Sequence, residues 1–501
     1  MRSHPAPSAL LHHFAAVLRD PRTFRMLFGL HVLIVIAATV LMRNTRSADY
    51  YTYWELASGL LQGKYSFWHS LDPYPPDTFR TPGYPLFVAV ASLGCTSLHV
   101  LVAIQAGLYI ASLVLVTQIL RRFVPDDLLP RTLFLLVLLP NIQLVYYATL
   151  VFPECLLGFL IIAYLDKETG GGHWAISGLL LGMIILVRPV YLLYPVFRVG
   201  LGLLTSSNRS AATKRALATA AIAIAVILPY GAWNKIHLGI FWPTPIEGSA
   251  PNIHMGFWQH RLAGKVTHRY WHYNFQGREL VPFVSDADTD RYLVEYNREW
   301  DQIEKEAEPY LSETDRKHQK EFDKRQELFP TYSPAYTVAR ARIIERYNWN
   351  HIKAEPGYYL TTRLYTALRL WVTGVNMQLI GHPGLSAKVS AVYPMFVTFF
   401  FVACGLFLAA VQSLRRRPEM GGTLPMWVFV IYGWLIHVPV TIQSRYTIPL
   451  HLPVLLLGTL ALTSLIRRRI GGPNTRSRPT YPHQRTASPD LPGHRERTGR
   501  A

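Results

Sequence analysis

Charged residues and cysteines are scarce in this chain of 501 residues. Only 16% of the residues are Asp, Glu, Lys or Arg, whereas a soluble protein of this length normally carries about 25%. The three cysteines, Cys95, Cys155 and Cys404, lie in apolar surroundings, and their spacing does not suit a zinc site. This composition disfavours a soluble fold, and we interpret the cysteines as buried free thiols.

Apolar residues make up half of the chain and are concentrated in blocks. Each block approaches the roughly 17–25 residues that cross about 30 Å of hydrocarbon as a helix. We therefore predict an all-α polytopic membrane protein with about ten transmembrane helices and a large extracytoplasmic loop region. The predicted spans are 26–42, 97–120, 130–148, 151–165, 174–189, 190–205, 214–233, 390–414, 424–442 and 447–466. No small-x-small cleavage site follows the first span, so we expect a retained helix rather than a signal peptide.

The positive charge of the chain follows one side of this topology. The net charge is +19, and the basic residues gather at the ends of the predicted spans and in the C-terminal segment, which disfavours a nucleic-acid partner. With the N-terminus in the cytoplasm, every short basic cluster falls inside, as the positive-inside rule requires. These clusters are Arg2, Arg19, Arg22 and Arg25; Arg121 and Arg122; Lys167; Arg198, Arg209, Lys214 and Arg215; Arg415 to Arg417; and Arg467 to Arg469.

The predicted spans divide the chain into five parts. These are a cytoplasmic N-terminus (1–25), an N-terminal transmembrane region with a first outer loop (26–233, loop 43–96), a large extracytoplasmic loop domain (234–389), C-terminal transmembrane helices (390–466) and a disordered basic cytoplasmic tail (467–501). The charged stretch Ser285 to Phe329 has helical spacing and predicts solvated helices within the large loop.

Four ionisable residues lie at the predicted outer boundary of the membrane. Asp49 follows the first span, Glu154 and Arg188 lie at the next two outer turns, and Arg445 lies at the last one. Each residue alone could be an interfacial anchor whose side chain reaches the headgroups. Ionisable groups at membrane depth are costly and usually face a cavity or a bundle interior. Because all four lie on one face, we predict that they share an outer cavity.

A carboxylate beside arginines suits a particular chemistry. The carboxylate can accept the proton of an attacking hydroxyl, and guanidinium groups can hold phosphate oxygens in pairs and stabilise the charge that develops as the phosphate leaves. At the outer membrane boundary, this arrangement fits a substrate with a polar head and a lipid tail.

Several ordered motifs resemble the glycosyltransferase C superfamily, and within it the bacterial branch of lipid A aminoarabinose transferases, relatives of the protein O-mannosyltransferases. The motifs are Asp49-Tyr-Tyr-Thr-Tyr-Trp-Glu-Leu-Ala57 with Leu60 and Gly63-Lys-Tyr65; Arg80-Thr-Pro-Gly-Tyr-Pro85; Pro153-Glu154; Gly178 to Arg188-Pro189 with Pro195; Pro229-Tyr-Gly-Ala-Trp-Asn234 with Gly239; Pro356-Gly-Tyr-Tyr-Leu360; and Arg445-Tyr-Thr-Ile-Pro449. The resemblance runs from about residue 26 to residue 466.

The resemblance implies roles for some of these residues. Asp49 takes the position of the aspartate that acts as catalytic base or positions the acceptor, and Glu154 takes the second acidic position, where it could instead orient an arginine. Glu55, Asp72 and Asp77 are alternatives that lack the spacing of the motif. The residues expected to bind the substrate phosphate are Arg80, Arg188, Arg445 and Lys64, and those expected to pack the loop or contact sugar are Tyr53, Tyr84 and Tyr446.

Other segments leave alternatives open. The aromatic stretch Phe241 to Trp258 fits either sugar stacking or an interfacial belt. The charged segment 260–330 matches no motif of the family, so the acceptor does not follow from the resemblance. No acidic pair with metal-ligand spacing occurs beyond what Asp49 and Glu154 could form, so the sequence gives no support for a divalent cation but leaves one open, and we expect no other cofactor.

The resulting prediction is an inverting glycosyltransferase in the bacterial cytoplasmic (inner) membrane, multi-pass, with its active site facing outside. Its partners would be a polyprenyl-phosphate sugar donor, a hydroxyl acceptor on a lipid, glycan or protein, and membrane lipid. A transporter or lipid flippase is the alternative, but it predicts polar residues near mid-membrane and matching broken helices in two halves. A membrane scaffold would leave the set of Asp49, Arg188 and Arg445 unexplained.

Overall fold

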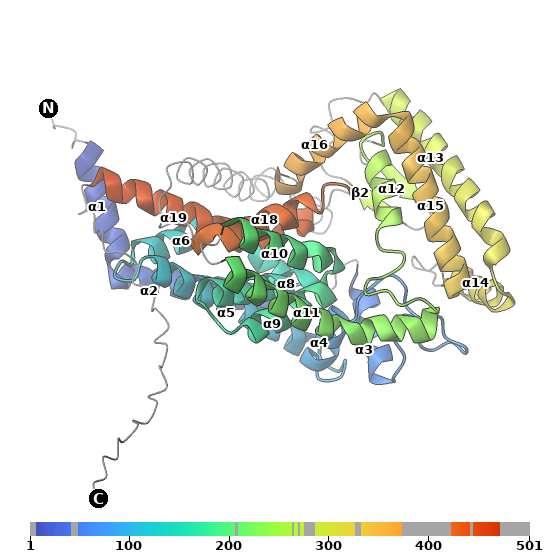
Figure 1. Cartoon of the computed structure of the whole chain (residues 1–501), viewed down its shortest axis with the longest axis horizontal. Helices are drawn as coiled ribbons and strands as arrows, with labels where there is room; N and C mark the ends of the chain where they lie inside the picture. The colour runs from blue at the N-terminus through green and yellow to red at the C-terminus, as the bar shows by residue number, and fades with distance from the viewer. Residues whose placement is uncertain are drawn as a thin grey trace, which may run out of the picture.

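The computed structural model describes residues 7–41, 49–205, 209–262, 265–268, 271–274, 286–325, 332–372, 422–440 and 444–470. Figure 1 shows a long bundle of helices, with a second group of helices at the end of the bundle opposite α1. The bundle comprises α1 (Pro7–Arg19), α2 (Pro21–Leu41), α5 (Leu98–Phe123), α6 (Leu129–Leu138), α7 (Ile142–Ala148), α8 (Pro153–Thr169), α9 (Trp174–Val187), η1 (Pro189–Leu193), α10 (Tyr194–Thr205), α11 (Arg209–Leu238), α18 (Leu424–Leu435), η6 (Ser444–Tyr446), η7 (Ile448–Leu450) and α19 (His451–Arg469).

The remaining elements lie in the two outer segments. The first outer loop forms α3 (Tyr50–Leu61) and α4 (Gly83–Ala91). The outer group, as we call the second group of helices, consists of α12 (Ala250–Trp258), β1 (Lys265–His268), β2 (Trp271–Asn274), α13 (Asp286–Ala307), η3 (Glu308–Tyr310), α14 (Glu313–Arg325), α15 (Pro334–Ala354) and α16 (Pro356–Val372). Strands β1 and β2 pair in antiparallel register, so they add a two-stranded sheet to the predicted all-α architecture.

Four of the described helices are long and apolar enough to cross a membrane. They are Pro21–Leu41, Leu98–Phe123, Arg209–Leu238 and the continuous segment Ile448–Arg469, and three shorter apolar helices accompany them: α6, α9 and α18. These helices confirm the membrane class of the protein. The predicted span 390–414 lies outside the described residues, and the number of ten spans stays a prediction.

Proline residues mark two places where helices of the bundle end. The predicted span 130–148 is in fact two helices, α6 and α7, separated around Pro140. Proline cannot donate the helical hydrogen bond, and its ring clashes with the preceding turn. The division between 174–189 and 190–205 is observed where it was predicted, because α9 ends at Val187 and η1 begins at Pro189.

Glycine allows the central helices of the bundle to approach closely. A β-carbon added at Gly178 would lie 2.6 Å from Cβ of Ile222 on α11, and one added at Gly182 would lie 2.5 Å from Cβ of Val226. Small residues spaced four apart let two helix backbones pack against each other within a membrane. The Gly-rich sequence of α9 therefore holds α9 against α11, and the end of α9 carries Arg188.

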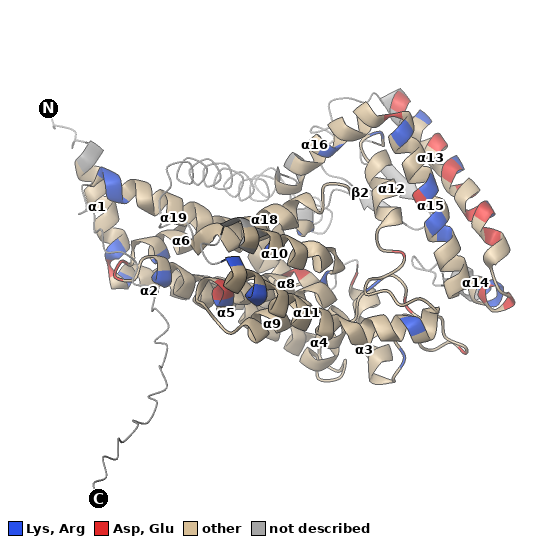
Figure 2. Cartoon of the chain, viewed as in Figure 1, with Lys and Arg blue, Asp and Glu red and all other residues tan. Residues whose placement is uncertain are grey.

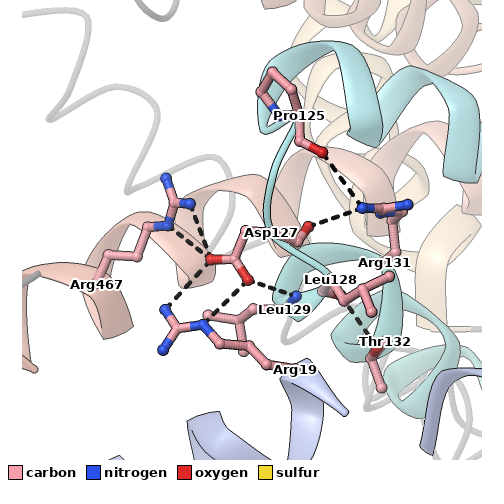
Figure 3. Close-up of polar contacts among 8 residues, drawn as sticks. All are labelled: Arg19, Pro125, Asp127, Leu128, Leu129, Arg131, Thr132 and Arg467. Atoms are coloured by element: carbon pink, nitrogen blue, oxygen red, sulfur yellow. Dashed lines mark hydrogen bonds and ion pairs between the residues drawn. The ribbon is translucent and has the colours of Figure 1, made fainter. Parts of the chain in front are cut away.

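Asp127 joins three elements at the end of the bundle that carries α1 (Figure 3). Its carboxylate accepts hydrogen bonds from Arg19 of α1 at 3.1 Å and from Arg467 of α19 at 2.9 Å, as well as from the backbone N–H of Leu129 at 2.9 Å. Burial alone would raise the pKa of Asp127, but these hydrogen bonds hold it below its usual value. The carboxylate thus ties the first and last described helices to the turn before α6.

The outer group has its own small core and a charged exterior. Figure 2 shows α13, α14 and α15 densely marked with acidic and basic residues, whereas the bundle helices are largely free of them. The solvated helices predicted for 285–329 are therefore present as α13 and α14. Inside, α12, α13 and α15 share one buried apolar cluster, which consists of Ala250, Phe257, Trp258, Leu262, Tyr296, Trp300, Ile303 and Ile344.

Candidate active site

Asp49 immediately precedes α3, but its side chain does not cap that helix. The residue is 8% exposed, and its carboxylate contacts two arginines that lie far apart in the sequence. Arg445 Nη1 donates to Oδ2 at 2.5 Å, and Arg80 Nη2 lies 3.3 Å from Oδ1. The structure therefore brings together the first outer loop and the last outer turn, and neither helix capping nor surface exposure explains Asp49.

Arg80 is fixed by its backbone as well as by its side chain. Its backbone N–H donates to Oδ1 of Asp77 at 2.7 Å, and its carbonyl accepts hydrogen bonds from the hydroxyls of Tyr65 at 3.0 Å and Tyr230 at 3.1 Å. Its guanidinium donates to the hydroxyl of Tyr53 at 3.1 Å and lies over the ring of that residue. A guanidinium held in this way loses little further conformational entropy when it binds an anion.

The Pro-Gly pair that follows Arg80 has a steric explanation. A β-carbon at Gly83 would lie 2.5 Å from the backbone carbonyl of Leu186, at the end of α9. Only glycine lets the start of α4 approach the backbone of α9 this closely. This contact sets the separation between the segment that carries Arg80 and the segment that carries Arg188.

Glu154 and Arg188 form the second ion pair of the site. Glu154 lies in the first turn of α8, where the helix dipole favours a negative charge, and its side chain is fully buried. Arg188, directly after α9, donates to Oε1 of Glu154 and lies over the ring of Tyr446 at 5.2 Å. Glu154 therefore orients an arginine, which is the second of the two roles considered for it.

The five charged groups act on one another electrostatically. Burial alone would raise the pKa of Asp49, but the positive charges of Arg445, Arg80 and Arg188 hold it well below its usual range. Glu154 in turn acts on Arg445 and helps to keep it charged. Three guanidinium groups face two carboxylates, so the cluster carries one positive charge in excess and attracts an anion.

The other predicted residues fall into two groups. Tyr53 and Tyr446 pack against Arg80 and Arg188, and the ring of Tyr84 meets that of Tyr53 edge to face at 4.7 Å. Lys64 is not part of the cluster, because its ammonium group donates to the carbonyl of His69 and lies over the ring of Tyr74. The assignment of Lys64 to phosphate binding has no support from this geometry.

The alternative acids of the first outer loop have other contacts. Glu55 pairs with His69 at 3.1 Å, and Asp72 is exposed. Asp77 is buried and accepts the backbone N–H groups of Phe79 and Arg80. Burial raises the pKa of Asp77 to about 6, although these hydrogen bonds oppose the shift. Asp77 thus shapes the turn that presents Arg80, and Asp49 is the acid that contacts the arginines.

One connection between the site and the outer group was not foreseen from the sequence. Glu247 accepts a hydrogen bond from the hydroxyl of Thr78 at 2.9 Å, and its backbone N–H donates to the carbonyl of Thr78 at 3.2 Å. Arg340 of α15 pairs with Glu247 at 3.5 Å and with Glu304 of α13 at 2.8 Å. Glu247 is the single acid within the aromatic stretch Phe241 to Trp258, and this isolated charge is the feature of the sequence that could have indicated the connection.

No protein-family model and no curated protein matches the chain. Among solved structures, the chain is similar to the archaeal oligosaccharyltransferase AglB from Archaeoglobus fulgidus in complex with an inhibitory peptide and a dolichol-phosphate. The two chains are 15% identical with a TM-score of 0.45, and the match covers 89% of this chain and 50% of the AglB chain. The apo form of the Archaeoglobus fulgidus oligosaccharyltransferase gives 15% identity, a TM-score of 0.45 and coverages of 89% and 51%. ArnT from Cupriavidus metallidurans, bound to undecaprenyl phosphate, has 13% identity and a TM-score of 0.37, with coverages of 89% and 79%.

The chain spans about half the length of the oligosaccharyltransferases. Similarity at this level carries no information about the substrate of this protein.

Proposed function

We propose that this protein is a membrane glycosyltransferase that transfers a sugar from a polyprenyl-phosphate donor to a hydroxyl acceptor at the extracytoplasmic face, with inversion at the anomeric carbon. The observation that carries the proposal is the contact of Asp49 with both Arg80 and Arg445. It combines a proton acceptor with two anion-binding groups in one buried cluster. The resemblance of the outer-loop motifs to the glycosyltransferase C superfamily supports the same reaction class.

The arginines account for donor binding. A sugar linked to a polyprenyl phosphate carries one negative charge on its phosphodiester, which matches the single positive charge in excess in the cluster. Arg80 and Arg445 each have further N–H groups beyond those that contact Asp49, and a guanidinium can hold two phosphate oxygens at once. As the glycosidic bond breaks, negative charge grows on the phosphate, and the fixed guanidinium groups stabilise it.

The same contacts explain how Asp49 becomes an effective base. In the cluster as described, the arginines lower the pKa of Asp49, so that the carboxylate is ionised but weakly basic. A bound phosphate shares the charge of Arg80 and Arg445, which reduces their effect on Asp49 and raises its basicity. Donor binding thus activates the base that the acceptor hydroxyl requires.

The transfer step then balances as a single displacement. The acceptor oxygen attacks the anomeric carbon from the side opposite the phosphate, and its proton passes to Asp49. The new carbon–oxygen bond forms as the bond to the phosphate oxygen breaks, and polyprenyl phosphate leaves with the electron pair. Glu154 contributes by fixing Arg188, and Tyr53 contributes by fixing Arg80.

The test is transfer by the purified full-length protein. The protein is incubated with radiolabelled polyprenyl-phosphate sugars and a membrane extract that supplies acceptors, and wild type is compared with Asp49→Asn. We expect transfer by the wild type and a loss of at least about a hundredfold in the variant, the usual scale of a missing general base. Asp127→Asn is the matched control, because Asp127 also pairs with two arginines but lies at the other end of the bundle.

Two results would contradict the proposal. Equal transfer by wild type and Asp49→Asn would remove Asp49 from the reaction. Binding and movement of the polyprenyl-phosphate sugar across the membrane, without transfer to any acceptor, would instead identify a lipid flippase.

A further inference from the structure

Three potential metal ligands meet where the helices of the outer group cross. His254 lies on α12, Glu299 on α13 and His351 on α15. His254 Nε2 lies 3.2 Å from Oε1 of Glu299, and His351 Nε2 lies 2.8 Å from Oε1 and 2.7 Å from Oε2. The ligand atoms of all three residues lie within 4.8 Å of one another. One carboxylate therefore faces two imidazoles from two different helices.

The tautomer of His254 is fixed by its neighbour Asn348. The side-chain amide of Asn348 donates through Nδ2 to the carbonyl of Ala250 at 2.9 Å, so its oxygen must face His254. That oxygen lies 3.1 Å from Nδ1 of His254, which therefore carries the proton and donates it. In a neutral ring, Nε2 then presents its lone pair toward Glu299, the form in which imidazole binds a metal.

This orientation is the one that metal-binding histidines adopt. A ligating histidine almost always donates its other ring N–H to a carboxylate or carbonyl oxygen, which fixes its tautomer and ring orientation. Glu299 is supported in the same way, because the indole N–H of Trp258 donates to its Oε1 at 3.4 Å. The contacts around the three residues thus form a supporting shell, with Asn348 and Trp258 as its members.

Aromatic rings enclose the three residues. The ring of Phe257 stacks on His351 at 4.5 Å, and Trp300 meets His254 edge to face at 5.0 Å. His254 is fully buried, and the side chains of Glu299 and His351 are 13% and 20% exposed. Such an apolar enclosure strengthens the attraction between a carboxylate and a cation and limits exchange with water.

Two of the three contacts are spaced nearly as a bound ion requires. Two ligands bound to zinc at about 2.1 Å with tetrahedral angles lie about 3.4 Å apart. The distance between His254 and Glu299 is about 0.2 Å shorter than this, and the distance from His351 to Glu299 would lengthen by about 0.7 Å. Two imidazoles and one carboxylate form a donor set that suits a divalent transition metal and leaves one position for water.

We propose that His254, Glu299 and His351 bind a divalent transition-metal ion, of which zinc is the reference case, that fastens α12, α13 and α15 to one another. The ion would replace an imidazole proton as the positive partner of Glu299. It would also link three helices whose shared apolar core is small. This site uses none of the residues of the arginine cluster, so the proposal is independent of the reaction proposed above.

The test measures metal binding by the tag-free full-length protein. The purified protein is stripped with a chelator, titrated with zinc against a chromophoric zinc chelator, and analysed for metal content after gel filtration. We expect one tightly held zinc ion per chain and a higher melting temperature for the loaded protein. Glu299→Gln and His351→Asn should each weaken zinc binding by more than about tenfold, because loss of even a supporting residue of a metal site typically costs about ten- to a hundredfold.

Glu306→Gln is the matched control. Glu306 also lies on α13 and joins it to α15, through Arg346 and Tyr347, but it lies on the surface away from the two histidines. Its loss should leave zinc binding unchanged. Cobalt in place of zinc adds an optical signature of imidazole coordination, measured on the wild type.

The proposal is overturned if wild type holds less than a tenth of an equivalent of zinc at micromolar free metal. It is also overturned if a folded Glu299→Gln variant binds zinc as tightly as Glu306→Gln. Should both ligand variants fail to fold, the wild-type titration and the cobalt spectrum still decide the question.

Discussion

Replacing Asp49 and replacing Arg445 should change the binding of polyprenyl phosphate, the proposed reaction product, in opposite directions. Both residues belong to one ion pair, with Arg445 Nη1 2.5 Å from Oδ2 of Asp49. If the arginine serves the phosphate and the carboxylate serves the proton, a phosphate must compete with Asp49 for the same guanidinium group. Loss of the competitor then strengthens phosphate binding, and loss of the guanidinium weakens it.

The size of the first effect follows from the charges. A phosphate on the far side of Arg445 would lie roughly 7 Å from the Asp49 carboxylate, and at an effective dielectric constant of about 20 their repulsion is about 2 kcal/mol. The carboxylate side chain is 11% exposed, and partial access of solvent reduces the repulsion toward about 1 kcal/mol. Asp49→Asn should therefore bind polyprenyl phosphate roughly five- to thirtyfold more tightly, although we expect it to transfer sugar at least about a hundredfold more slowly.

Arg445→Gln removes a charge-assisted hydrogen bond to the phosphate, which is worth about 1.5–3 kcal/mol. It also leaves Asp49 with Arg80 as its remaining close cationic partner, so the carboxylate repels the phosphate more strongly. The expected loss of affinity is about a hundredfold. The double variant lacks the Asp49 charge altogether and should bind more tightly than Arg445→Gln alone.

The measurement is displacement of a fluorescent polyprenyl phosphate from each variant in lipid nanodiscs at neutral pH. Asp127→Asn serves as the control, since it removes a carboxylate paired with two arginines at the opposite end of the bundle. A weaker affinity in Asp49→Asn than in wild type would refute the competition between carboxylate and phosphate. An unchanged affinity in Arg445→Gln would refute the assignment of that arginine to the phosphate.

Three further predictions concern the first outer loop and the topology. Gly83→Ala places a methyl group against the backbone of α9 and should lower transfer by about a hundredfold through displacement of the arginines, whereas Gly357→Ala, with open space around it, should not. The raised pKa of Asp77 means that the wild type loses stability as the pH rises through about 6. Asp77→Asn should therefore have the stability of the wild type at about pH 4 and be more stable than the wild type by up to about 3 kcal/mol near pH 7. Equal melting temperatures of the two proteins across this pH range would contradict this prediction. In a cysteine-free background, Trp349→Cys should react with an impermeant maleimide on intact cells and Arg121→Cys only after permeabilisation.

The main elements of the site could be predicted because topology and charge act together. Asp49, Glu154, Arg188 and Arg445 each follow or precede an apolar block, and the positive-inside rule places all four at the same membrane face. Helices that cross a membrane side by side bring such residues near one another even when they are far apart in the chain. Hydropathy and charge therefore sufficed to select four of the five residues in the cluster, and the motif around Arg80 supplied the fifth.

The side-chain pairing could not be predicted, because it depends on backbone positions that the pattern does not determine. Nothing in the sequence indicates that Glu154 pairs with Arg188 while Asp49 pairs with Arg80 and Arg445. Lys64 lies in the same loop and carries the same charge as the arginines, but the loop directs it toward His69. Charge alone does not distinguish these cases.

The outer group was the least predictable part for a related reason. The charged sequence of the outer group correctly predicted solvated helices, but a pattern of charged residues does not determine which buried polar residues contact one another. His254, Glu299 and His351 have no motif spacing, because each comes from a different helix. The strands β1 and β2, of four residues each, were also not predicted from the sequence.

The balance of charges in the arginine cluster explains how the proposed anion-binding site can exist before a ligand binds. Three guanidinium groups placed together beneath the surface would repel one another and lose hydration, at a cost of several kcal/mol for each unpaired ion. Asp49 and Glu154 compensate most of this cost, and they leave a single positive charge that attracts one phosphodiester. The two carboxylates differ, because the side chain of Glu154 is fully buried against Arg188, whereas that of Asp49 is 11% exposed and contacts two arginines. In the proposed reaction, a phosphate would therefore displace Asp49 from its arginines more easily than it would displace Glu154, and the released carboxylate would be the one to which we assign the proton transfer.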